Sequence, residues 1–140
     1  MAKLFPLEVH TPTRLFFSAP VEAFTALLED GEIGVHGGHA PFAASVRTGI
    51  FKIKDKEGVW REAFTTEGML EVRKGKTVLM VGVAEWPQEI DAERARAAKN
   101  EAEETLKVRI LKFETEAAKA QLRRAEMRLK VFARNTEQRE

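Results

Sequence analysis

The chain has 140 residues, enough for one domain or for one domain with an appendage, and its 44% hydrophobic content suffices for a buried core. A net charge of +1 gives no reason to expect binding to nucleic acid or to an anionic membrane surface. Because the chain contains no cysteine, disulfides, thiolate catalysis and cysteine-ligated zinc are excluded.

The sequence predicts neither a secretion signal nor a membrane span. Residues 1–6 hold no long apolar stretch and end on a proline, so we expect no signal peptide. No apolar run approaches the roughly 18 residues that a spanning helix requires. We therefore expect a cytosolic protein that meets a membrane only through a partner.

Residues 4–83 are predicted to form an all-β domain. Runs rich in β-branched and aromatic residues alternate here with breaks that contain Gly, Pro, Asp or Thr. Strands of about 5–8 residues with a turn every 8–12 residues or so are typical of an all-β sandwich or barrel. The expected strands cover residues 4–10, 14–18, 21–28, 42–46, 50–54, 59–65, 69–73 and 77–83.

Residues 31–41, Gly-Glu-Ile-Gly-Val-His-Gly-Gly-His-Ala-Pro, interrupt this series. Four glycines and a proline in so short a span exclude an ordinary helix or a central strand, so we expect a loop. Glu32, His36 and His39 are the residues of this loop that can do proton or metal chemistry. The loop is therefore either a chemical site or a shaped backbone surface that docks onto another protein.

The pattern changes at Pro87. Residues 85–90 are expected to form a hinge, and Asp91 is a good N-cap for the helical segment that follows. Residues 92–134 contain no Gly or Pro and are rich in Ala, Glu, Lys, Arg and Leu, which favours helix. Two apolar seams run along this segment, and they consist of Ala95, Ala98 and Ala102, and of Ala118, Leu122, Ala125, Leu129 and Phe132.

The two seams are out of phase, with the slip between about Lys107 and Glu114, where Val108, Ile110 and Leu111 interrupt the polar surface. We therefore predict an all-β N-terminal sandwich in residues 1–86, a hinge at 87–90, and a C-terminal hairpin of two antiparallel helices in 91–140. The net charges differ as well, because residues 1–90 carry 10 Lys/Arg against 12 Asp/Glu and residues 91–140 carry 13 against 10. Alanine seams bury little area, so the hairpin should be weakly held and able to open.

Taken together, these parts resemble the epsilon subunit of the F-type, proton-translocating ATP synthase of bacteria and chloroplasts. The Gly-Glu-Ile-Gly and Gly-His-Ala-Pro segments of residues 31–41 are similar to the signature of that family. The resemblance extends over residues 4–134. Further matching segments are Thr48-Gly49-Ile50, Glu67-Gly68-Met69-Leu70-Glu71-Val72 and Ile90-Asp91-Ala92-Glu93-Arg94-Ala95.

The resemblance implies a non-catalytic rotor subunit of the central stalk. Its sandwich would grip the gamma subunit and rest on the ring of c subunits, which couples their rotation to ATP synthesis. Its helices would pack on the sandwich in one state and extend along gamma into the alpha/beta catalytic hexamer in another, where they inhibit ATP hydrolysis. It would sit peripherally at the cytoplasmic face of the bacterial inner membrane, or at the stromal face of the thylakoid, without membrane insertion and without nucleic acid.

The same resemblance assigns the contact with the c-ring and gamma to the loop residues Glu32, Gly38, His39 and Pro41. Glu32 would meet the polar loops of the c-ring, and His39 would order the turn through hydrogen bonds. A histidine that merely satisfies backbone carbonyls in a glycine turn explains His39 equally well. His36 and Gly37 depart from the family pattern. For gamma, we expect apolar edges near Phe16-Phe17, Phe42 and Leu70.

The family's ATP-binding motif, by resemblance, matches a second set of residues. No cofactor is required for the rotor role, and ATP would be a weakly bound regulatory ligand that holds the helices down. Arginine suits this role because its planar fork pairs with phosphate oxygens. In place of a further arginine of the first helix, however, the chain has Glu101. The matching residues are Glu85, Ile90, Asp91, Arg94, Ala95, Arg124 and Arg128.

The second helix also carries a basic face, of which Arg123, Arg124 and Arg128 would contact acidic segments of the catalytic beta subunits in the extended state. Opposite charge would favour this contact and salt would weaken it. A hydrated surface is the alternative explanation, as it is for Arg124 and Arg128 in the ATP-binding set. The full face consists of Lys119, Arg123, Arg124, Arg128, Lys130 and Arg134.

Two other functions fit parts of the sequence. One is a metal-dependent hydrolase built on Glu32, His36 and His39, which would need three ligands and an open position. The other is a stand-alone nucleotide-sensing adaptor that works without a synthase. A glycine-rich loop would hold the two histidines poorly, so we expect no metal site. The chain offers no Walker loop and no nucleophile–base pair, so we expect no catalysis by this chain alone.

Overall fold

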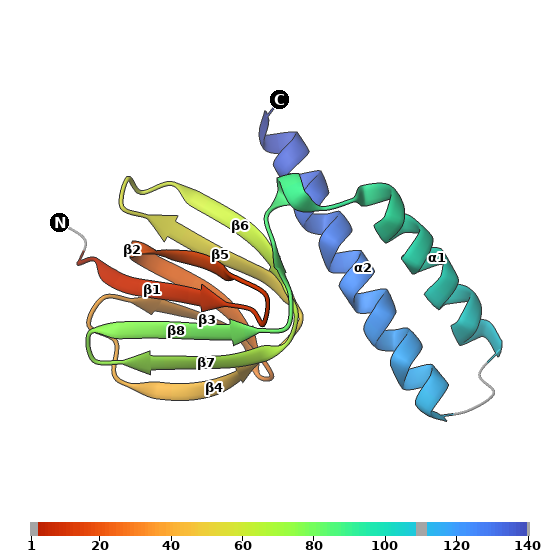
Figure 1. Cartoon of the computed structure of the whole chain (residues 1–140), viewed down its shortest axis with the longest axis horizontal. Helices are drawn as coiled ribbons and strands as arrows, with labels where there is room; N and C mark the ends of the chain where they lie inside the picture. Colours follow the sequence, from red (N-terminus) through yellow and green to blue (C-terminus); the bar gives the residue numbers. More distant parts are fainter. Residues whose placement is uncertain (1–2, 109–111, 140) are drawn as a thin grey trace. The chain divides into compact units, whose positions relative to one another are not determined.

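The computed structural model of the chain describes residues 3–108 and 112–139, and the side chains of all of these except 112, 113 and 136–139. The chain divides into two compact units, Met1–Glu85 and Trp86–Glu140. The first unit is all-β and the second is helical (Figure 1). The predicted fold class, a β-sandwich followed by two helices, is confirmed.

The first unit is a β-sandwich in which the long strand β2 takes part in both layers. One layer runs in the order β1-β8-β7-β4 and the other in the order β2-β5-β6-β9, with β3 paired to β2. β2 also pairs with β1, which links the layers. The strands are β1 (Phe5–His10), β2 (Leu15–Leu28), β3 (Gly31–His36), β4 (Phe42–Val46), β5 (Gly49–Asp55), β6 (Trp60–Thr65), β7 (Gly68–Arg73), β8 (Lys76–Val81) and β9 (Ala84–Glu85).

The break expected at Ala19-Pro20 is wrong, because β2 continues through Pro20. Pro20 lies directly opposite Pro6 of β1, and the pairings of these strands with their other neighbours begin one residue later, at Val21 with β5 and at Leu7 with β8. In an antiparallel ladder, alternate residues point their N–H groups away from the partner strand. Two prolines opposite each other at such a position remove no ladder hydrogen bond.

The first half of the glycine-rich segment is also a strand, so the prediction of a loop over all of residues 31–41 is wrong. β3 pairs with β2 alone, with Gly31 opposite Leu28 and Gly34 opposite Thr25. It is an edge strand, where glycine and a short ladder are tolerated. The turn between β3 and β4, residues 37–41, remains a loop.

The core of the sandwich consists of large apolar side chains that alternate along the strands. Phe24 and Phe51 are almost completely buried, and their ring centroids are 5.4 Å apart. Ile53, Phe64 and Leu79 are buried to the same degree. Buried and less buried residues alternate along β5 and β8, as expected of strands with one face against the core.

The chain between the sandwich and the helices is more ordered than a simple hinge. The strand expected at residues 77–83 ends at Val81, and β9 follows and pairs with β6. Pro87–Glu89 forms a short 3-10 helix, and Trp86 N donates to Glu89 Oε1 at 2.9 Å. Residues 86–90 thus carry a capped turn.

The second unit contains two helices, α1 (Ala92–Val108) and α2 (Lys112–Arg139), which lie side by side and run in opposite directions (Figure 1). Asp91 is the N-cap of α1, as predicted, because Arg94 N donates to its Oδ1 at 3.1 Å. Of the predicted seams, Ala95, Ala102, Ala118 and Ala125 are buried. Of the residues expected at the phase slip, Val108 ends α1, whereas Ile110 and Leu111 lie outside the described residues.

Candidate functional site

The residues predicted to form one contact loop lie at two different ends of β3. Glu32 is beside the turn that joins β2 to β3, opposite Leu27. His36 ends the strand, and Gly38, His39 and Pro41 follow in the turn toward β4. His36 lies four residue steps along the strand from Glu32, a distance of about 13 Å at about 3.3 Å per residue. Glu32 therefore cannot act together with the two histidines.

This separation removes the geometric basis of the metal-dependent hydrolase. A zinc ion needs ligands at about 2.0–2.2 Å, which Glu32 and His36 cannot provide together. Among the described residues, no group of three or more His, Cys, Asp or Glu is close enough to hold a metal ion.

The turn at residues 37–41 is shaped by local hydrogen bonds and by one glycine. His39 N donates to His36 O at 3.2 Å, and His39 Nδ1 lies 2.8 Å from Ala40 O. Gly38 has φ of +85°, which a residue with a side chain rarely adopts. The ring of His39 lies 5.0 Å from that of Phe42, centroid to centroid, at the start of β4. His39 thus orders the turn, and its exposed ring remains available to a partner.

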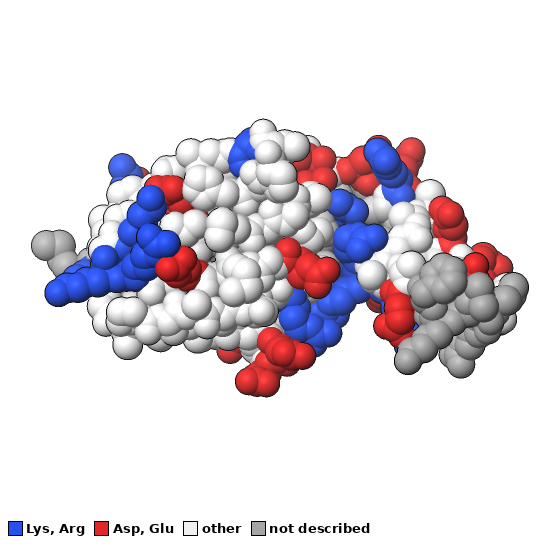
Figure 2. Space-filling view, turned by 60° about the horizontal axis from the view of Figure 1, so that its bottom comes forward, with Lys and Arg blue, Asp and Glu red and all other residues white. Residues whose placement is uncertain are grey.

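The apolar surface of the sandwich differs from the one expected. Leu70 is completely buried and Phe16 is 8% exposed, so both belong to the core. Met69 precedes Leu70 in β7 and pairs with Met80 of β8. The side chains of Met69 and Met80 are 46% and 50% exposed. Figure 2 shows a largely uncharged surface on the β unit, with Lys and Arg gathered at one end. Solvent-exposed methionines that lie next to each other on adjacent strands form an apolar patch, and such patches are typical of a docking face.

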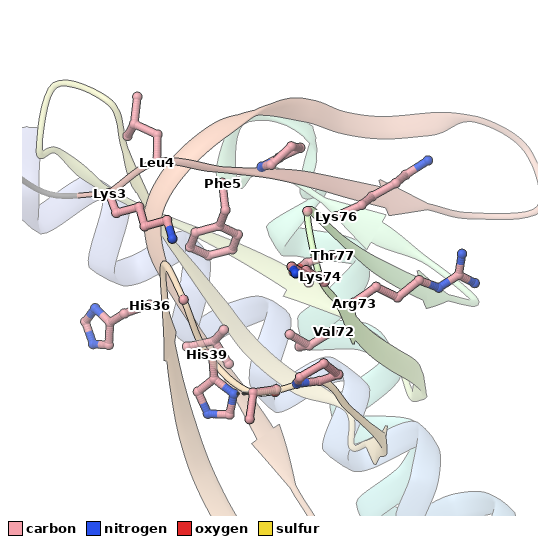
Figure 3. A pocket seen from close by; sticks show the side chains of 16 residues that line it. Lys3, Leu4, Phe5, His36, His39, Val72, Arg73, Lys74, Lys76 and Thr77 are labelled. Atoms are coloured by element: carbon pink, nitrogen blue, oxygen red, sulfur yellow. Dashed lines mark hydrogen bonds between the residues drawn. The ribbon is translucent and has the colours of Figure 1, made fainter.

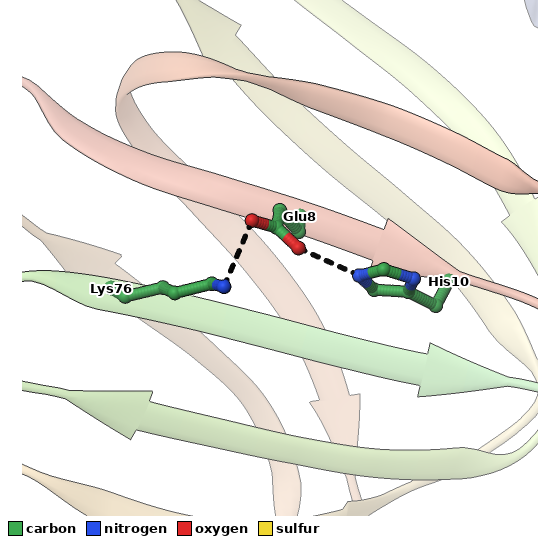
Figure 4. Close-up of polar contacts among 3 residues, drawn as sticks. All are labelled: Glu8, His10 and Lys76. Carbon is green, nitrogen blue, oxygen red and sulfur yellow. Dashed lines mark hydrogen bonds and ion pairs between the residues drawn. The ribbon is translucent and has the colours of Figure 1, made fainter.

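A polar cluster borders this surface on β1. Glu8 Oε1 lies 2.7 Å from His10 Nε2, and Glu8 Oε2 accepts from Lys76 Nζ at 3.0 Å (Figure 4). The hydrogen bond with His10, and then that with Lys76, holds the pKa of Glu8 below its usual value of 4.5. His10 lies opposite Met80 in the ladder between β1 and β8, so the polar cluster lies beside the pair of Met69 and Met80.

Within the helical unit, the predicted nucleotide-binding residues gather at the end where α1 begins. The buried alanines pair the start of α1 with the part of α2 near Ala125, since the helices are antiparallel. At about 100° per residue, Arg94, Arg124 and Arg128 project from the same side of this pair. Ile90 and Ala95 are buried and contribute packing. Glu85 belongs to the first unit, as the last residue of β9.

Helical geometry divides the predicted basic face of α2 into two stripes. Arg124 and Arg128 lie about 40° apart on one side of the alanine seam. Arg123 lies about 160° from Ala125, on the face of α2 that points away from the seam, and about 100° from Arg124. A partner that contacts one stripe therefore does not face the other. The stripe of Arg123 also contains Lys119, Lys130 and Arg134.

One group of residues escaped the sequence-based prediction. β1 pairs in parallel with β8, so the starts of both strands lie at the same end of the sandwich. Lys3, Arg73, Lys74 and Lys76 are thereby gathered around a cavity that the turn at residues 37–41 closes on the other side. Lys3 and Arg73 are 70 positions apart in the sequence, so no local sequence pattern indicates that they line one cavity.

Comparison with known proteins identifies the family. The model of the β-sandwich domain of the ATP synthase delta/epsilon chain matches residues 4–87, and the model of its long α-helix domain matches residues 88–133. The chain belongs to the ATP synthase delta/epsilon chain family.

Curated relatives are epsilon chains. The ATP synthase epsilon chain of Caldanaerobacter subterraneus subsp. tengcongensis is 43% identical over 138 residues, which cover 98% of this chain and 99% of the relative. That of Caldicellulosiruptor saccharolyticus is 43% identical over 128 residues, covering 91% and 93%. The predicted resemblance to the epsilon subunit is confirmed, and the chain is a subunit of an ATP synthase.

Solved ATP synthases share the fold of this epsilon-family chain. A chain in the Euglena gracilis mitochondrial OSCP/F1/c-ring structure has a TM-score of 0.70 and 21% identity, with 98% of this chain and 82% of that chain covered. A chain in the Tetrahymena thermophila central stalk/c-ring structure has a TM-score of 0.61 and 15% identity, with coverage of 93% and 97%. In the described part of the chain, no helix is both long and apolar enough to span a membrane.

Proposed function

We propose that this chain is a non-catalytic rotor subunit of the central stalk, which couples rotation of the c-ring and gamma to ATP synthesis and whose helical unit inhibits ATP hydrolysis. The observation that carries the proposal is the division of an epsilon-family chain into a tightly packed β unit and a separate helical pair with an alanine seam. The subunit would be peripheral, at the cytoplasmic face of the bacterial inner membrane.

The β unit is suited to transmit force through protein contacts. Its core is rigid, because fully buried phenylalanine, leucine and isoleucine side chains fill the space between its layers. Gamma would dock on the exposed methionine pair of Met69 and Met80, and the c-ring would meet the turn beside Glu32. The turn of His39 lies at the other end of β3 and would serve a separate contact.

The helical unit is suited to change its position because its packing is weak. Each buried alanine contributes a single methyl group, worth about 0.8 kcal/mol. Leucines 122 and 129 flank this seam but are only half-buried. A pair of helices held in this way can be released by contacts of a few kcal/mol with another protein.

Removal of the helices tests the proposal. A chain ending at residue 90, reassembled with the other subunits, should still bind gamma but should raise the rate of ATP hydrolysis above that of the enzyme with the full chain. Gamma binding is measured by co-purification and hydrolysis by phosphate release. Unchanged hydrolysis would contradict the inhibitory role, and loss of gamma binding would contradict the assignment of docking to the β unit.

We further propose that ATP is a weak regulatory ligand of the helical unit. Arg94, Arg124 and Arg128 present three guanidinium groups on one side of the helical pair, next to the start of α1, where phosphate is favoured by the helix dipole. Calorimetric titration of the full chain with MgATP should give saturable heat that Arg94→Ala abolishes. Arg96→Ala, two residues away on the other side of α1, should leave it unchanged. Absence of heat at millimolar MgATP would contradict this proposal.

A further inference from the structure

The end of the sandwich that carries the starts of β1 and β8 contains a cavity of about 540 Å³. Three segments line it: the residues before and at the start of β1, the turn at residues 37–41, and the turn between β7 and β8. This volume lies within the range of about 300–1,000 Å³ that small-molecule sites occupy.

The rim of the cavity carries four cationic side chains, two of which are neutralised within the protein. Arg73 Nε donates to Glu71 Oε1 at 2.6 Å, and Lys76 Nζ donates to Glu8 Oε2 at 3.0 Å. Lys3 and Lys74 form no ion pair with any other described residue. The rim therefore holds an excess of two positive charges.

The ammonium group of Lys3 is directed into the cavity. Figure 3 shows it turned toward the ring of Phe5, whereas Arg73 and Lys76 extend away from that ring. A Cβ added at Gly38 would lie 3.9 Å from Lys3 Nζ, which places the ammonium over the glycine turn. At Gly37 an added Cβ would collide with the backbone carbonyl of Lys3, so glycine is needed here for the N-terminal segment to pass.

The floor of the cavity is apolar. Phe5 is half-buried and its ring packs on that of the core residue Phe24, with centroids 6.0 Å apart. Val35 and Val72 are 1% and 4% exposed and close the cavity from below. Pro41 adds a further apolar wall. An apolar floor bordered by two lysines without an ion pair among the described residues suits a ligand that has a doubly charged anionic end and an apolar body.

We propose that this cavity binds an organic phosphate, a phosphomonoester attached to an aromatic or apolar group. A phosphomonoester carries between −1.5 and −2 charges at about pH 7, which matches the two uncompensated ammonium groups. Its organic part would lie on Phe5 and Pro41. The chemistry is common to a free nucleotide and to the headgroup of phosphatidic acid. The site is separate from the arginines of the helical unit.

Nuclear magnetic resonance of the full chain tests the proposal and locates the site. Addition of AMP should shift the amide resonances of residues 3–5, 36–40 and 73–77 saturably. Inorganic phosphate should shift the same set with an affinity about tenfold lower, because it cannot use the apolar floor. Vesicles containing phosphatidic acid, compared with phosphatidylcholine vesicles, test the lipid as the source.

Variants distinguish binding in the cavity from non-specific attraction of the anion to surface lysines. Lys74→Gln should weaken AMP binding about tenfold. Lys56→Gln removes an exposed lysine from the turn between β5 and β6, outside the cavity, and should change it less than about twofold. Gly37→Ala should also weaken binding, although it removes no charge, because it displaces Lys3. The dispersion of the amide spectrum shows that each variant is folded.

Several outcomes would overturn the proposal. If neither AMP at about 10 mM nor phosphatidic acid vesicles shift the cavity resonances, the site does not exist. If Lys56→Gln weakens binding as much as Lys74→Gln, the attraction is general. Equal affinity for AMP and inorganic phosphate would show that the organic part of the ligand does not pack on Phe5, which contradicts the proposal. Shifts caused by phosphatidic acid alone would support the phosphate chemistry with a lipid as its source.

Discussion

Gly68, at the start of β7, shows how a single atom constrains this sandwich. A Cβ added there would collide with the backbone of Met80 and Val81 on the neighbouring strand, and backbone atoms cannot move aside cheaply. We therefore predict that Gly68→Ala lowers the free energy of unfolding by about 1–3 kcal/mol, measured by urea denaturation. Gly34→Ala is the control, because nothing lies within 4 Å of its added Cβ. An equal loss in both variants would contradict this prediction.

Glu8 provides a prediction for the dependence of stability on pH. Its folded-state pKa is lowered by His10 and Lys76, so the ion pairs stabilise the protein above the unfolded-state pKa. This contribution is lost as the pH falls through the lowered pKa and Glu8 becomes protonated. The urea midpoint of Glu8→Gln should therefore lie below that of the wild type at pH 6, and the difference should shrink toward pH 3.

The control for this experiment is Glu29→Gln, which removes an exposed carboxylate that forms no ion pair with another described residue. The difference between the wild type and Glu8→Gln should exceed that between the wild type and Glu29→Gln at pH 6. A difference for Glu8→Gln that stays constant from pH 6 to pH 3 would show that these ion pairs contribute nothing to the pH dependence.

At the residue scale, local chemistry was readable from the sequence and long-range chemistry was not. The N-cap at Asp91 follows from residue type alone. The cluster of Glu8 with Lys76 depends on the parallel pairing of β1 with β8, which no local pattern indicates. The same pairing gathers the lysines of the cavity.

At the scale of elements, the errors occurred where tertiary pairing overrides local propensity. Pro20 reads as a break, yet opposite Pro6 it removes no ladder hydrogen bond. The glycines of residues 31–34 read as a loop, yet an edge strand accepts them beside β2. Strands with period-two alternation, such as β5, were predicted correctly because one of their faces is buried against the core.

The alanine seam of the helices leads to a prediction about packing. Ala102 is completely buried, so Ala102→Leu inserts three carbon atoms where two helices meet. We predict that this variant lowers the thermal stability of the helical unit and speeds proteolysis of residues 91–139. Ala97→Leu, at an exposed position of the same helix, should leave both unchanged. Equal behaviour of the two variants would contradict close approach of the helices at this seam.

At the scale of the whole molecule, the fold class could be predicted because the local sequence pattern differs between the two units. The family was predicted from the resemblance of the Gly-Glu-Ile-Gly and Gly-His-Ala-Pro segments to its signature. Turn residues break residues 4–83 into short strands, whereas residues 92–134 contain no Gly or Pro, and this difference separates the β unit from the helical one. The candidate site was predicted less well. Glu32 and His39 are close in sequence but lie at opposite ends of β3, and Leu70, expected at an interface, is in the core.

The proposed inhibition of hydrolysis requires the two helices to be released from their hairpin. The chain has no cysteine, so a pair introduced by Ala102→Cys and Ala118→Cys can be oxidised across the seam without a competing thiol in the same chain. The most direct measurement is ATP hydrolysis by the assembled synthase carrying this pair, compared under oxidising and reducing conditions and with each single cysteine variant. We predict that oxidation relieves inhibition and that reduction restores it, whereas inhibition that persists in the cross-linked enzyme would contradict the account.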